Sequence, residues 1–307
     1  MQPKINFIIN PIAGQGAGKL ALPEIERLAK ESFPVFGIVC TEYPGHAIEL
    51  ARQAAIGGDD ILVAVGGDGT SNEVLNGIMQ ANQQGYRNTS MGIIAIGRGN
   101  DLAFGFGIPA GLQDGFEIIR KGNHRLMDVG LITGGDYPQG RYFGNGVGIG
   151  FDAVVGFEAV KLTHLHGYLN YIVAALRTIF LFFNAPLVQI DYDDKQLTQP
   201  SLMVSIMNGR RMGGGFMMAP HSEPDDGIFD FCIAGQLSRM GILKMIPQFM
   251  KGTQSSQPQI KMGQAMKVHI LALNGSLPTH ADGETICKAG TELTINIIKR
   301  PLSVLCR

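Results

Sequence analysis

The sequence is poor in cysteine, with four in 307 residues. Cys40, Cys232, Cys287 and Cys306 lie far apart, and none belongs to a Cys-x-x-Cys pair. This excludes the common zinc and dithiol redox motifs. The first ten residues also lack the layout of a secretory signal peptide, since strand-like residues begin at once. We therefore expect a protein of the reducing cytoplasm.

The sequence has almost no excess of charge and no convincing membrane span. Lys and Arg number 25 against 26 Asp and Glu, so overall charge gives no attraction to nucleic acid, which we do not expect as a partner. The apolar stretch from Tyr168 to Phe183 is short and includes Asn170 and Arg177. It favours a buried or half-buried helix. A helix that lies in a lipid interface is the alternative, which leaves transient contact with a membrane surface open.

Glycine, by contrast, is abundant, with 42 residues. The glycines have no fixed period, which excludes collagen-like and low-complexity chains. They cluster after short β-branched runs, where the backbone must turn tightly or approach a ligand closely.

The first half of the chain alternates strand-like and helix-like segments. This alternation predicts an α/β domain with a parallel sheet covered by helices. The expected strands are residues 5–9, 35–40, 61–65 and 91–96, and the expected helices include residues 20–30, 46–56 and the segment that contains Val74 to Met79.

Beyond about residue 125 the pattern changes to short strands separated by Gly, Pro, Asn and Asp. This predicts a mainly antiparallel β domain, interrupted by helices near 151–183 and 238–251. The expected strands are residues 126–132, 142–146, 187–192, 202–207, 228–233, 268–272 and 293–298.

A glycine-rich loop follows the first expected strand, from Asn10 to Lys19. Its backbone N–H groups suit a phosphate. It is not a Walker A loop, because Leu20 follows Lys19 where Ser or Thr is needed, and it lacks the third glycine of a dinucleotide fingerprint. A tight turn between strand and helix is an equal alternative.

A second loop, Gly66 to Thr70, ends the third expected strand. Its three glycines permit close approach to a ligand. Thr70 and Glu73 match a capping box that would start the next helix, whose positive end favours an anion. Asp68 beside such a turn suits a magnesium-bound nucleotide.

A third loop, Gly97 to Asp101, follows the fourth expected strand. Asn100 and Asp101 suit a helix cap, and Arg98 would donate to a phosphate. Ligands bind beyond the carboxyl ends of parallel strands. Three such loops at one sheet edge therefore predict a nucleotide site.

The ordered motifs resemble the diacylglycerol kinase catalytic-domain family, which includes bacterial lipid kinases and sphingosine kinases. The Gly-Gly-Asp-Gly element alone is shared with NAD kinases and phosphofructokinases. The matching segments run along the whole chain: Asn-Pro-x-x-Gly at 10–14, Thr41 with 45–47, 66–70, 99–101, 224–227 with Asp230, and Asp-Gly-Glu at 282–284.

The resemblance implies an N-terminal α/β domain of the NAD-kinase and phosphofructokinase type, residues 1–125, that binds ATP. It implies a β-sandwich substrate domain at 126–292, strands near 293–307 that return to the first domain, and an active site in the cleft. It also implies ATP and Mg²⁺ as cofactors and a lipid acceptor, with diacylglycerol first. The oligomeric state stays open, a homodimer included.

The resemblance further implies roles for individual residues. Glu284 would be the general base and Asp68 the acidic residue that organises magnesium and phosphates. Asp226, with backbone carbonyls near Glu223 and Ile228, would hold a structural Mg²⁺. The implied nucleotide contacts are Asn10, Pro11, Ile12, Ala13, Gly14, Thr41, Gly66, Gly67, Asp68, Gly69, Thr70, Ser71, Asn72, Arg98, Gly99, Asn100 and Asp101.

One residue departs from the family pattern. Arg98 stands where the family usually has Thr, so the pose of the nucleotide stays open. The alternatives are a kinase of a soluble substrate such as NAD, and a nucleotide-binding regulator without catalysis. Met212, Met217 and Met218 suit core packing, with an acyl-chain groove as the alternative. His164 and His166 suit a surface or substrate-facing helix better than a metal site.

Overall fold

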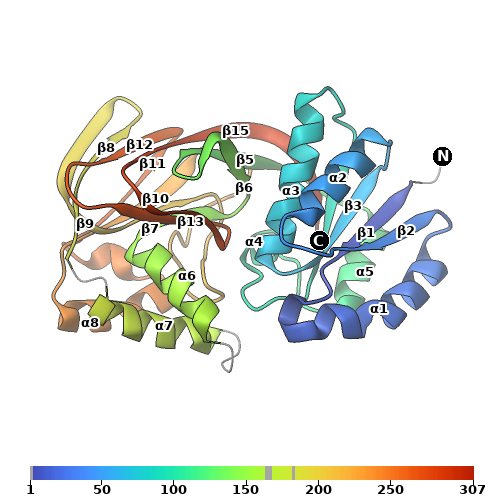
Figure 1. The fold of residues 1–307 in the computed structure, drawn as a ribbon, viewed down its shortest axis with the longest axis horizontal. Helices are drawn as coiled ribbons and strands as arrows, with labels where there is room; N and C mark the ends of the chain where they lie inside the picture. The colour runs from blue at the N-terminus through green and yellow to red at the C-terminus, as the bar shows by residue number, and fades with distance from the viewer. Residues whose placement is uncertain (1–2, 163–167, 182–183) are drawn as a thin grey trace. The chain divides into compact units, whose positions relative to one another are not determined.

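The computed structural model describes residues 3–162, 168–181 and 184–307. His164, His166 and the end of the apolar stretch at 182–183 lie outside these residues. The chain divides into two compact units (Figure 1). Unit 1 comprises Met1–Met127 with Arg300–Arg307, and unit 2 comprises Asp128–Lys299.

Unit 1 alternates strands and helices, as the sequence predicts. Its parallel strands lie in the order β4-β3-β1-β2, and the last strand, β15 (Glu292–Leu305), pairs with β4 through Ser303 and Val304. Its elements are β1 (Ile5–Ile9), α1 (Ala13–Ser32), β2 (Phe36–Cys40), α2 (His46–Ile56), β3 (Ile61–Gly66), α3 (Asp68–Gln83), β4 (Ser90–Ala95), α4 (Asp101–Gly105) and α5 (Leu112–Lys121).

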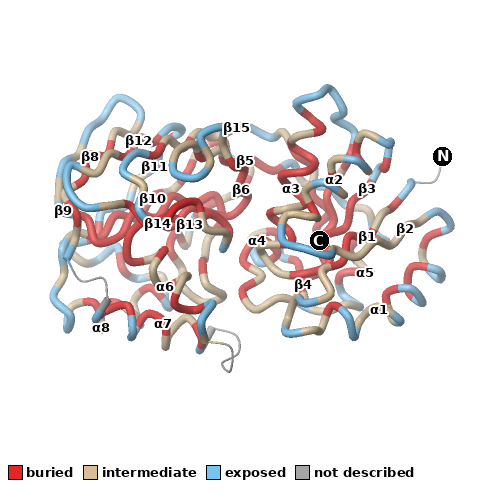
Figure 2. The backbone as a smooth tube through the Cα atoms, in the orientation of Figure 1, coloured by how far each residue is buried: buried red, intermediate tan, exposed pale blue. Residues whose placement is uncertain are grey.

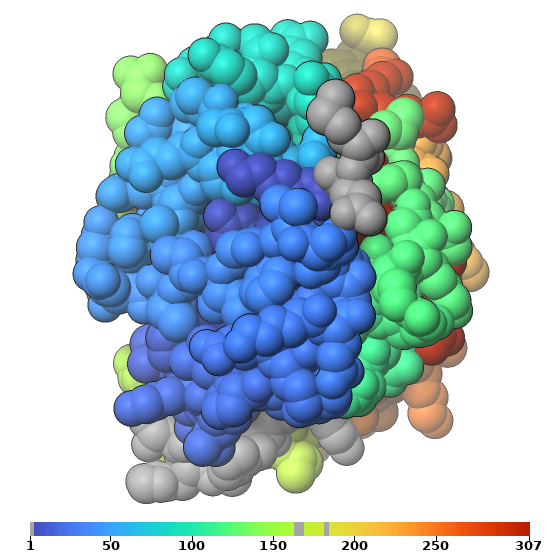
Figure 3. Space-filling model, turned by 90° about the vertical axis from the view of Figure 1, so that its right-hand side faces the viewer, coloured from blue at the N-terminus to red at the C-terminus, as the bar shows by residue number. Residues whose placement is uncertain are grey.

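The central strand β3 is buried along its whole length, which explains its unbroken run of apolar residues. Figure 2 shows the buried strands of this unit in red beneath partly exposed helices. Figure 3 views the unit from the side on which β2 and α1 lie in Figure 1, and the N-terminal third forms most of that surface.

Unit 2 is an antiparallel β-sandwich, which confirms the predicted fold class. Its elements are β5 (His124–Gly134), β6 (Tyr137–Phe143), β7 (Gly146–Gly150), α6 (Phe151–Lys161), α7 (Tyr168–Leu181), β8 (Leu187–Tyr192), β9 (Lys195–Met207), β10 (Phe229–Gly235), α8 (Arg239–Lys251), a 3-10 turn (Gln254–Ser256), β11 (Ile260–Ala265), β12 (Lys267–Ala272), β13 (Leu277–Ala281), β14 (Glu284–Gly290) and β15 (Glu292–Leu305).

The long strand β9 belongs to both sheets of the sandwich. Residues 195–200 pair with β8, and residues 201–207 pair with β7 and β10. One sheet contains β8, β12, β15, β5 and β6, and the other contains β7, β10, β11, β13 and β14. Their facing side chains, such as Val204, Phe231 and Ile270, form one fully buried cluster.

Helices α6, α7 and α8 cover the outer face of the sheet that contains β7, β9 and β10 (Figure 1). Ala174, Ala175 and Ile179 of α7 are buried in this contact, while Phe180 is exposed. The helix is therefore half-buried, as the sequence favours. No helix in the described part of the chain is both long and apolar enough to cross a membrane.

The sequence misplaces one strand of unit 2. We expected a strand over 142–146, but β6 ends at Phe143 and β7 begins at Gly146. The backbone N–H groups of Gly144, Asn145 and Gly146 all donate to the carboxylate of Asp282 instead of to a neighbouring strand. This partner lies far away in the sequence, so no local pattern marks the break.

Candidate active site

The first glycine loop of unit 1 is fixed by Asn10 at the end of β1. The backbone N–H of Asn10 donates to Val65 O (3.0 Å), and its side-chain Nδ2 donates to Thr70 Oγ1 (3.1 Å). The loop then turns through Gly14, Gln15 and Gly16, all with positive φ. A Cβ on Gly14 would lie 2.3 Å from Ile96 O, so glycine is required there.

The second and third loops touch each other. A Cβ built on Gly97 would lie 2.3 Å from Gly67 Cα, so only glycine permits this approach. Asn100 closes the third loop through two bonds with the backbone of Gly97, each 3.0 Å. The backbone at the carboxyl ends of β1, β3 and β4 thus gathers at one edge of the sheet, which suits phosphate binding.

Asp68 ties the second loop to the third. Its Oδ1 accepts hydrogen bonds from the backbone N–H groups of Asp101 (2.6 Å) and Leu102 (3.2 Å), at the start of α4. A Cβ on Gly99 would lie 2.6 Å from Asp68 Oδ2. The sequence assigned Asp68 to magnesium and phosphates alone. The structure adds that its carboxylate positions the neighbouring loop.

The predicted capping box is wrong. Helix α3 begins at Asp68, and its N-cap residue Gly67 makes no side-chain cap. Glu73 instead accepts from the backbone N–H groups of Gly45 (2.9 Å) and Ala47 (3.1 Å), at the start of α2. The matching spacing in the sequence therefore reflects a contact between two helices that pack together.

The other predicted nucleotide residues differ in their access to solvent. Thr70, Ser71 and Asn72 are buried, and Asn72 bonds with Asn76 in the next turn of α3. Thr41 lies at the carboxyl end of β2, where its N–H donates to Ile9 O (2.8 Å). Arg98 is partly exposed between Gly97 and Gly99. Arg98 is thus more accessible to a ligand than Ser71 or Asn72.

In unit 2, Glu284 follows a tight hairpin turn at Asp282 and Gly283. Asp282 and Gly283 both have positive φ, 49° and 86°, which is typical of a two-residue turn between antiparallel strands. The buried carboxylate of Asp282 holds this turn through its bonds to Gly144 (2.7 Å), Asn145 (2.9 Å) and Gly146 (2.9 Å). Partly exposed Glu284 is therefore fixed at the first position of β14, opposite Ala281.

Asp226 lies among further acidic residues of unit 2. Its Oδ1 accepts from Ile228 N (3.1 Å), and Asp128 Oδ2 accepts from Gly227 N (2.6 Å). Asp226 is exposed, but partial desolvation of its carboxylate raises its pKa, and the nearby charges of Asp128 and Asp225 raise it further. Burial also raises the pKa of Asp230, whose Oδ2 is buried without a hydrogen-bond partner among the described residues.

A cation here would be bound by one carboxylate together with backbone carbonyls and waters, and not by a cluster of side chains. No group of three or more His, Cys, Asp or Glu residues within 3–162, 168–181 and 184–307 is placed to share a metal ion. A Mg²⁺ held by Asp226, backbone carbonyls and waters needs no such group. The raised pKa of Asp226 and the unpaired oxygen of Asp230 are compatible with a cation at this place. The side chain of Glu223 forms an ion pair with Arg210.

Sequence reasoning missed Asp128 and a buried polar cluster on β9, β13 and α6. Asp128 is fully buried. The feature of the sequence that could have identified it is a single acidic residue within the apolar run 126–132. In the cluster, Ser205 Oγ donates to Asp152 Oδ2 (2.9 Å), and His280 Nε2 lies 3.8 Å from Asp152 Oδ1. These residues are widely separated in sequence, and no motif links them.

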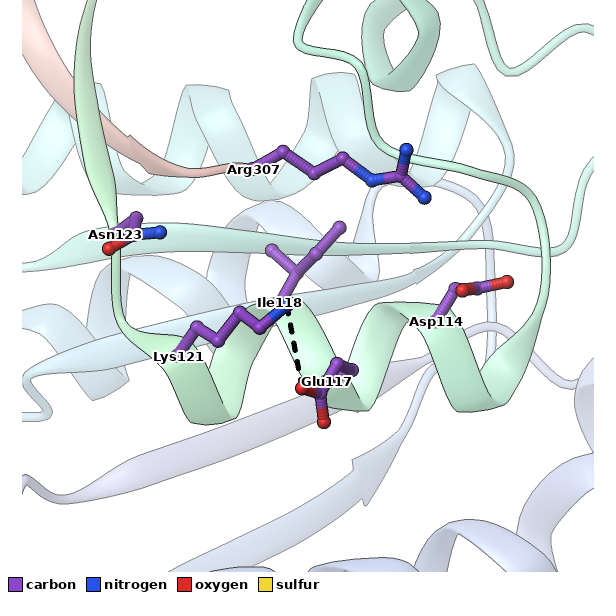
Figure 4. Close-up of a pocket in the computed structure, with 6 residues that line it drawn as sticks. All are labelled: Asp114, Glu117, Ile118, Lys121, Asn123 and Arg307. Atoms are coloured by element: carbon purple, nitrogen blue, oxygen red, sulfur yellow. Dashed lines mark ion pairs between the residues drawn. The ribbon is translucent and has the colours of Figure 1, made fainter.

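Two further features are unrelated to the predicted site. A pocket of about 280 Å³ in unit 1 is lined by Asp114, Glu117, Ile118, Lys121, Asn123 and Arg307, none of which we predicted (Figure 4). Met212 and Met218 are buried in the cluster beneath the helices of unit 2, which agrees with core packing.

Two protein families match successive parts of this chain. Residues 4–132 match the diacylglycerol kinase catalytic domain, and residues 145–306 match the YegS C-terminal NAD kinase beta sandwich-like domain. A diacylglycerol kinase of Mycobacterium tuberculosis is 27% identical over 95% of this chain and 92% of its own length. One of Bacillus subtilis is 26% identical over 92% of this chain and 89% of its own.

Solved structures share the fold. A diacylglycerol kinase crystal structure from Bacillus anthracis superposes with a TM-score of 0.75 at 21% identity, over 100% of this chain and 97% of that one. A yeast NADH kinase complexed with NADH gives 0.52 at 12% identity, over 100% of this chain and 83% of that one. At these identities the likeness concerns the fold alone.

Proposed function

Because the chain belongs to the diacylglycerol kinase catalytic-domain family, we propose that it transfers the γ-phosphate of ATP to a hydroxyl of diacylglycerol or a related lipid. The observation that carries this proposal is the contact between the Gly67 and Gly97 backbones, closed by Asp68. It gathers backbone N–H groups at the carboxyl end of a parallel sheet, where a triphosphate is best stabilised.

The proposed chemistry assigns separate tasks to the two units. In unit 1 the glycine loops and Arg98 orient the phosphates of the donor. In unit 2 Glu284 accepts the proton of the attacking hydroxyl, and the turn held by Asp282 fixes its position. Mg²⁺ that enters with the nucleotide neutralises phosphate charge. No covalent protein intermediate is required.

Asp68 has a double task in this proposal. One oxygen holds the start of α4 through Asp101 and Leu102, so the carboxylate is already fixed before a nucleotide arrives. Its negative charge beside the phosphates of a bound nucleotide would be favourable only together with a cation. Asp226 and the nearby carbonyls of Glu223 and Ile228 would hold a second Mg²⁺ that stabilises unit 2.

A product analysis tests the proposal. The protein is incubated with ATP, Mg²⁺ and a panel of diacylglycerol, sphingoid bases and other glycerolipids in mixed micelles, alongside NAD as a soluble acceptor. We expect a lipid product heavier by one phosphoryl group, with diacylglycerol the preferred acceptor. The same reaction without ATP, or with a different phosphate donor, shows whether ATP is the donor.

Three outcomes would contradict the proposal in different ways. Phosphorylation of NAD with every lipid untouched would indicate a kinase of a soluble substrate. ATP binding without transfer to any acceptor would indicate a nucleotide-binding regulator. Transfer to a lipid from another phosphate donor, but not from ATP, would leave the acceptor class standing and reject ATP as the donor.

A further inference from the structure

Tyr43 and His46 form a stacked pair of rings on the surface of unit 1, between β2 and α2. Their ring centroids lie 4.4 Å apart and their ring planes differ by 9°. The hydroxyl of Tyr43 donates to Glu49 Oε2 (3.0 Å), and the backbone N–H of Glu42 donates to His46 Nδ1 (3.1 Å). Each ring is therefore held in its orientation by a hydrogen bond of its own.

The segment that carries this pair is fixed at both of its ends. At one end, the N–H of Thr41 donates to Ile9 O at the end of β1 (2.8 Å). At the other end, the N–H groups of Gly45 (2.9 Å) and Ala47 (3.1 Å) donate to Glu73 of α3. Strand β1 leads into the first glycine loop, and α3 begins at the second. The position of the pair relative to these loops is therefore set by hydrogen bonds of the backbone.

Tyr43 is accessible in spite of this packing. It is 48% exposed although His46 covers one face of its ring, which leaves the opposite face accessible to a planar ligand. Stacked rings remove apolar surface from water and attract each other through the opposite partial charges of their faces and edges. Because the ring of Tyr43 is already ordered, a ligand that stacks on it loses little free energy to the ordering of side chains.

Tyr43 also lies at the edge of the sheet where the glycine loops gather. The four strands are parallel and lie in the order β4-β3-β1-β2, so their carboxyl ends share one edge. Neighbouring strands are about 4.8 Å apart, which puts β2 roughly 10 Å from β3. A nucleotide with its phosphates at the loops after β3 and β4 can therefore reach the turn after β2 with its base.

We propose that Tyr43 binds the base of the nucleotide by stacking on a purine, and so determines which nucleotides this site accepts. The inference rests on the proposed function, because it takes the glycine loops to bind the phosphates. A purine covers more of the ring than a pyrimidine does, so stacking favours ATP and GTP over CTP and UTP. Stacking tolerates any base, so the affinities for adenine and guanine nucleotides should differ less than those for purines and pyrimidines.

A purely structural role for the pair predicts a different result. In that case the stack stabilises the start of α2 and has no effect that depends on a base. Inorganic tripolyphosphate separates the two roles, because it has a chain of three phosphates but no base. Loss of a base contact weakens the binding of nucleotides alone, whereas a displaced loop weakens the binding of tripolyphosphate as well.

Calorimetry with Mg²⁺ and without a lipid acceptor measures the contribution of the ring. We expect the wild type to bind ATP and GTP more tightly than CTP and UTP. Tyr43→Ala should lower the affinity for ATP and GTP by about 5- to 150-fold, the range for loss of an aromatic ring that stacks on a base. Its affinity for tripolyphosphate should be unchanged. Tyr43→Phe retains the ring without the bond to Glu49, and should restore the preference for purines.

A fluorescence measurement locates the base directly, because the chain contains no tryptophan. Tyr43→Trp introduces one indole at the proposed contact, and its emission should change when ATP binds but not when tripolyphosphate binds. Tyr86 supplies the matched control. It is 45% exposed and lies between α3 and β4, at the amino end of the strands. Tyr86→Trp should not respond to ATP, and Tyr86→Ala should bind nucleotides as the wild type does.

The proposal is overturned if Tyr43→Ala binds ATP as the wild type does, or if it loses tripolyphosphate to the same extent. It is also overturned if the preference for purines depends instead on Phe104 of α4, which is 42% exposed and follows the third loop. In each of these cases ATP still binds to the wild type, so the proposed function stands. A wild type that binds neither nucleotide nor tripolyphosphate would reject the proposed function together with this inference.

Discussion

At the scale of single residues, the carboxylates of Asp282 and Asp68 each hold a segment of backbone beside a residue or loop of the candidate site. Asp282 accepts three backbone hydrogen bonds and so fixes the turn before Glu284. Asp68 accepts two and so fixes the start of α4 beside the glycine loops. A substitution at either position therefore has to separate loss of charge from loss of an acceptor.

We predict that Glu284→Gln lowers turnover about 10²- to 10⁴-fold, because the amide cannot accept the hydroxyl proton. Calorimetry should show ATP affinity close to that of the wild type, since the predicted nucleotide residues belong to unit 1. Glu26→Gln makes the same change on exposed α1 and should retain activity. Turnover near the wild-type rate in Glu284→Gln would reject Glu284 as the base.

For Asp68 we predict different results for two variants. Asp68→Asn retains an oxygen acceptor for Asp101 and Leu102, so its Tm should stay near that of the wild type, while Mg²⁺–ATP affinity and turnover fall severely. Asp68→Ala should lose activity and also about 1–3 kcal/mol of unfolding free energy, because two N–H groups lose their acceptor. An active Asp68→Asn would show that the residue only anchors the loop.

At the scale of elements, glycine decides how closely the loops of unit 1 approach. Gly67 and Gly97 lie just beyond the ends of the adjacent strands β3 and β4, and a methyl group on Gly97 has no space. A second element-scale feature is the outer surface of the sheet in unit 2, where His269 of β12 lies between Asp191 of β8 and Glu292 of β15. A substitution at Gly97 tests the first feature, and a substitution at His269 tests the second.

We predict that Gly97→Ala lowers the free energy of unfolding by about 1–3 kcal/mol through overpacking, and weakens ATP binding by separating the loops. Gly105→Ala in α4 is the matched control, because a Cβ there meets no atom within 4 Å outside its own helix. That control should be neutral or stabilise the protein by up to about 1 kcal/mol. Equal effects of the two substitutions in urea unfolding would contradict the steric argument.

The pKa of His269 is raised, first by its hydrogen bond with Glu292 and then by Asp191. A raised histidine pKa stabilises the fold below the unfolded-state pKa, and this stabilisation is lost as pH rises through the folded-state pKa. Wild type should therefore exceed His269→Gln in urea stability more at about pH 5 than at about pH 8. An advantage that grows with pH would contradict this sign.

At the scale of the whole molecule, ligand binding and stability are linked. Desolvation and nearby acids raise the pKa values of exposed Asp226 and of partly buried Asp230, so a cation that bound there would stabilise the folded state over the unfolded one. The strand β15 belongs to both units, since it pairs with β12 in unit 2 and with β4 in unit 1.

We predict that Mg²⁺ without nucleotide raises the Tm of the wild type, and that Asp226→Ala removes this shift. Asp194→Asn, at an exposed turn of the same unit, should retain it. Thermal melts with Mg²⁺ and with a chelator measure both variants. An identical Mg²⁺-dependent shift in wild type and Asp226→Ala would show that the ion binds elsewhere or not at all.

The sequence by itself determined the two-part architecture and the positions of the glycine loops that follow the strands of unit 1. Period-two and period-3.6 patterns arise from local geometry, and glycine after a strand marks a backbone constraint that acts within a few residues. Hence β1, β3, β4 and most sandwich strands lie where the pattern places them. The loops around Gly14, Gly67 and Gly97 follow directly from these patterns.

Only the tertiary structure decided which distant residues become partners. Glu73 holds α2 instead of capping its own helix, Asp282 interrupts the strand expected over 142–146, and Asp128 holds the turn at Gly227. Each interaction joins residues at least 26 positions apart, such as Glu73 with Ala47. A buried carboxylate requires hydrogen-bond donors, and the fold can supply them from any part of the chain. The spacing of residues in the sequence therefore does not predict which donors it binds.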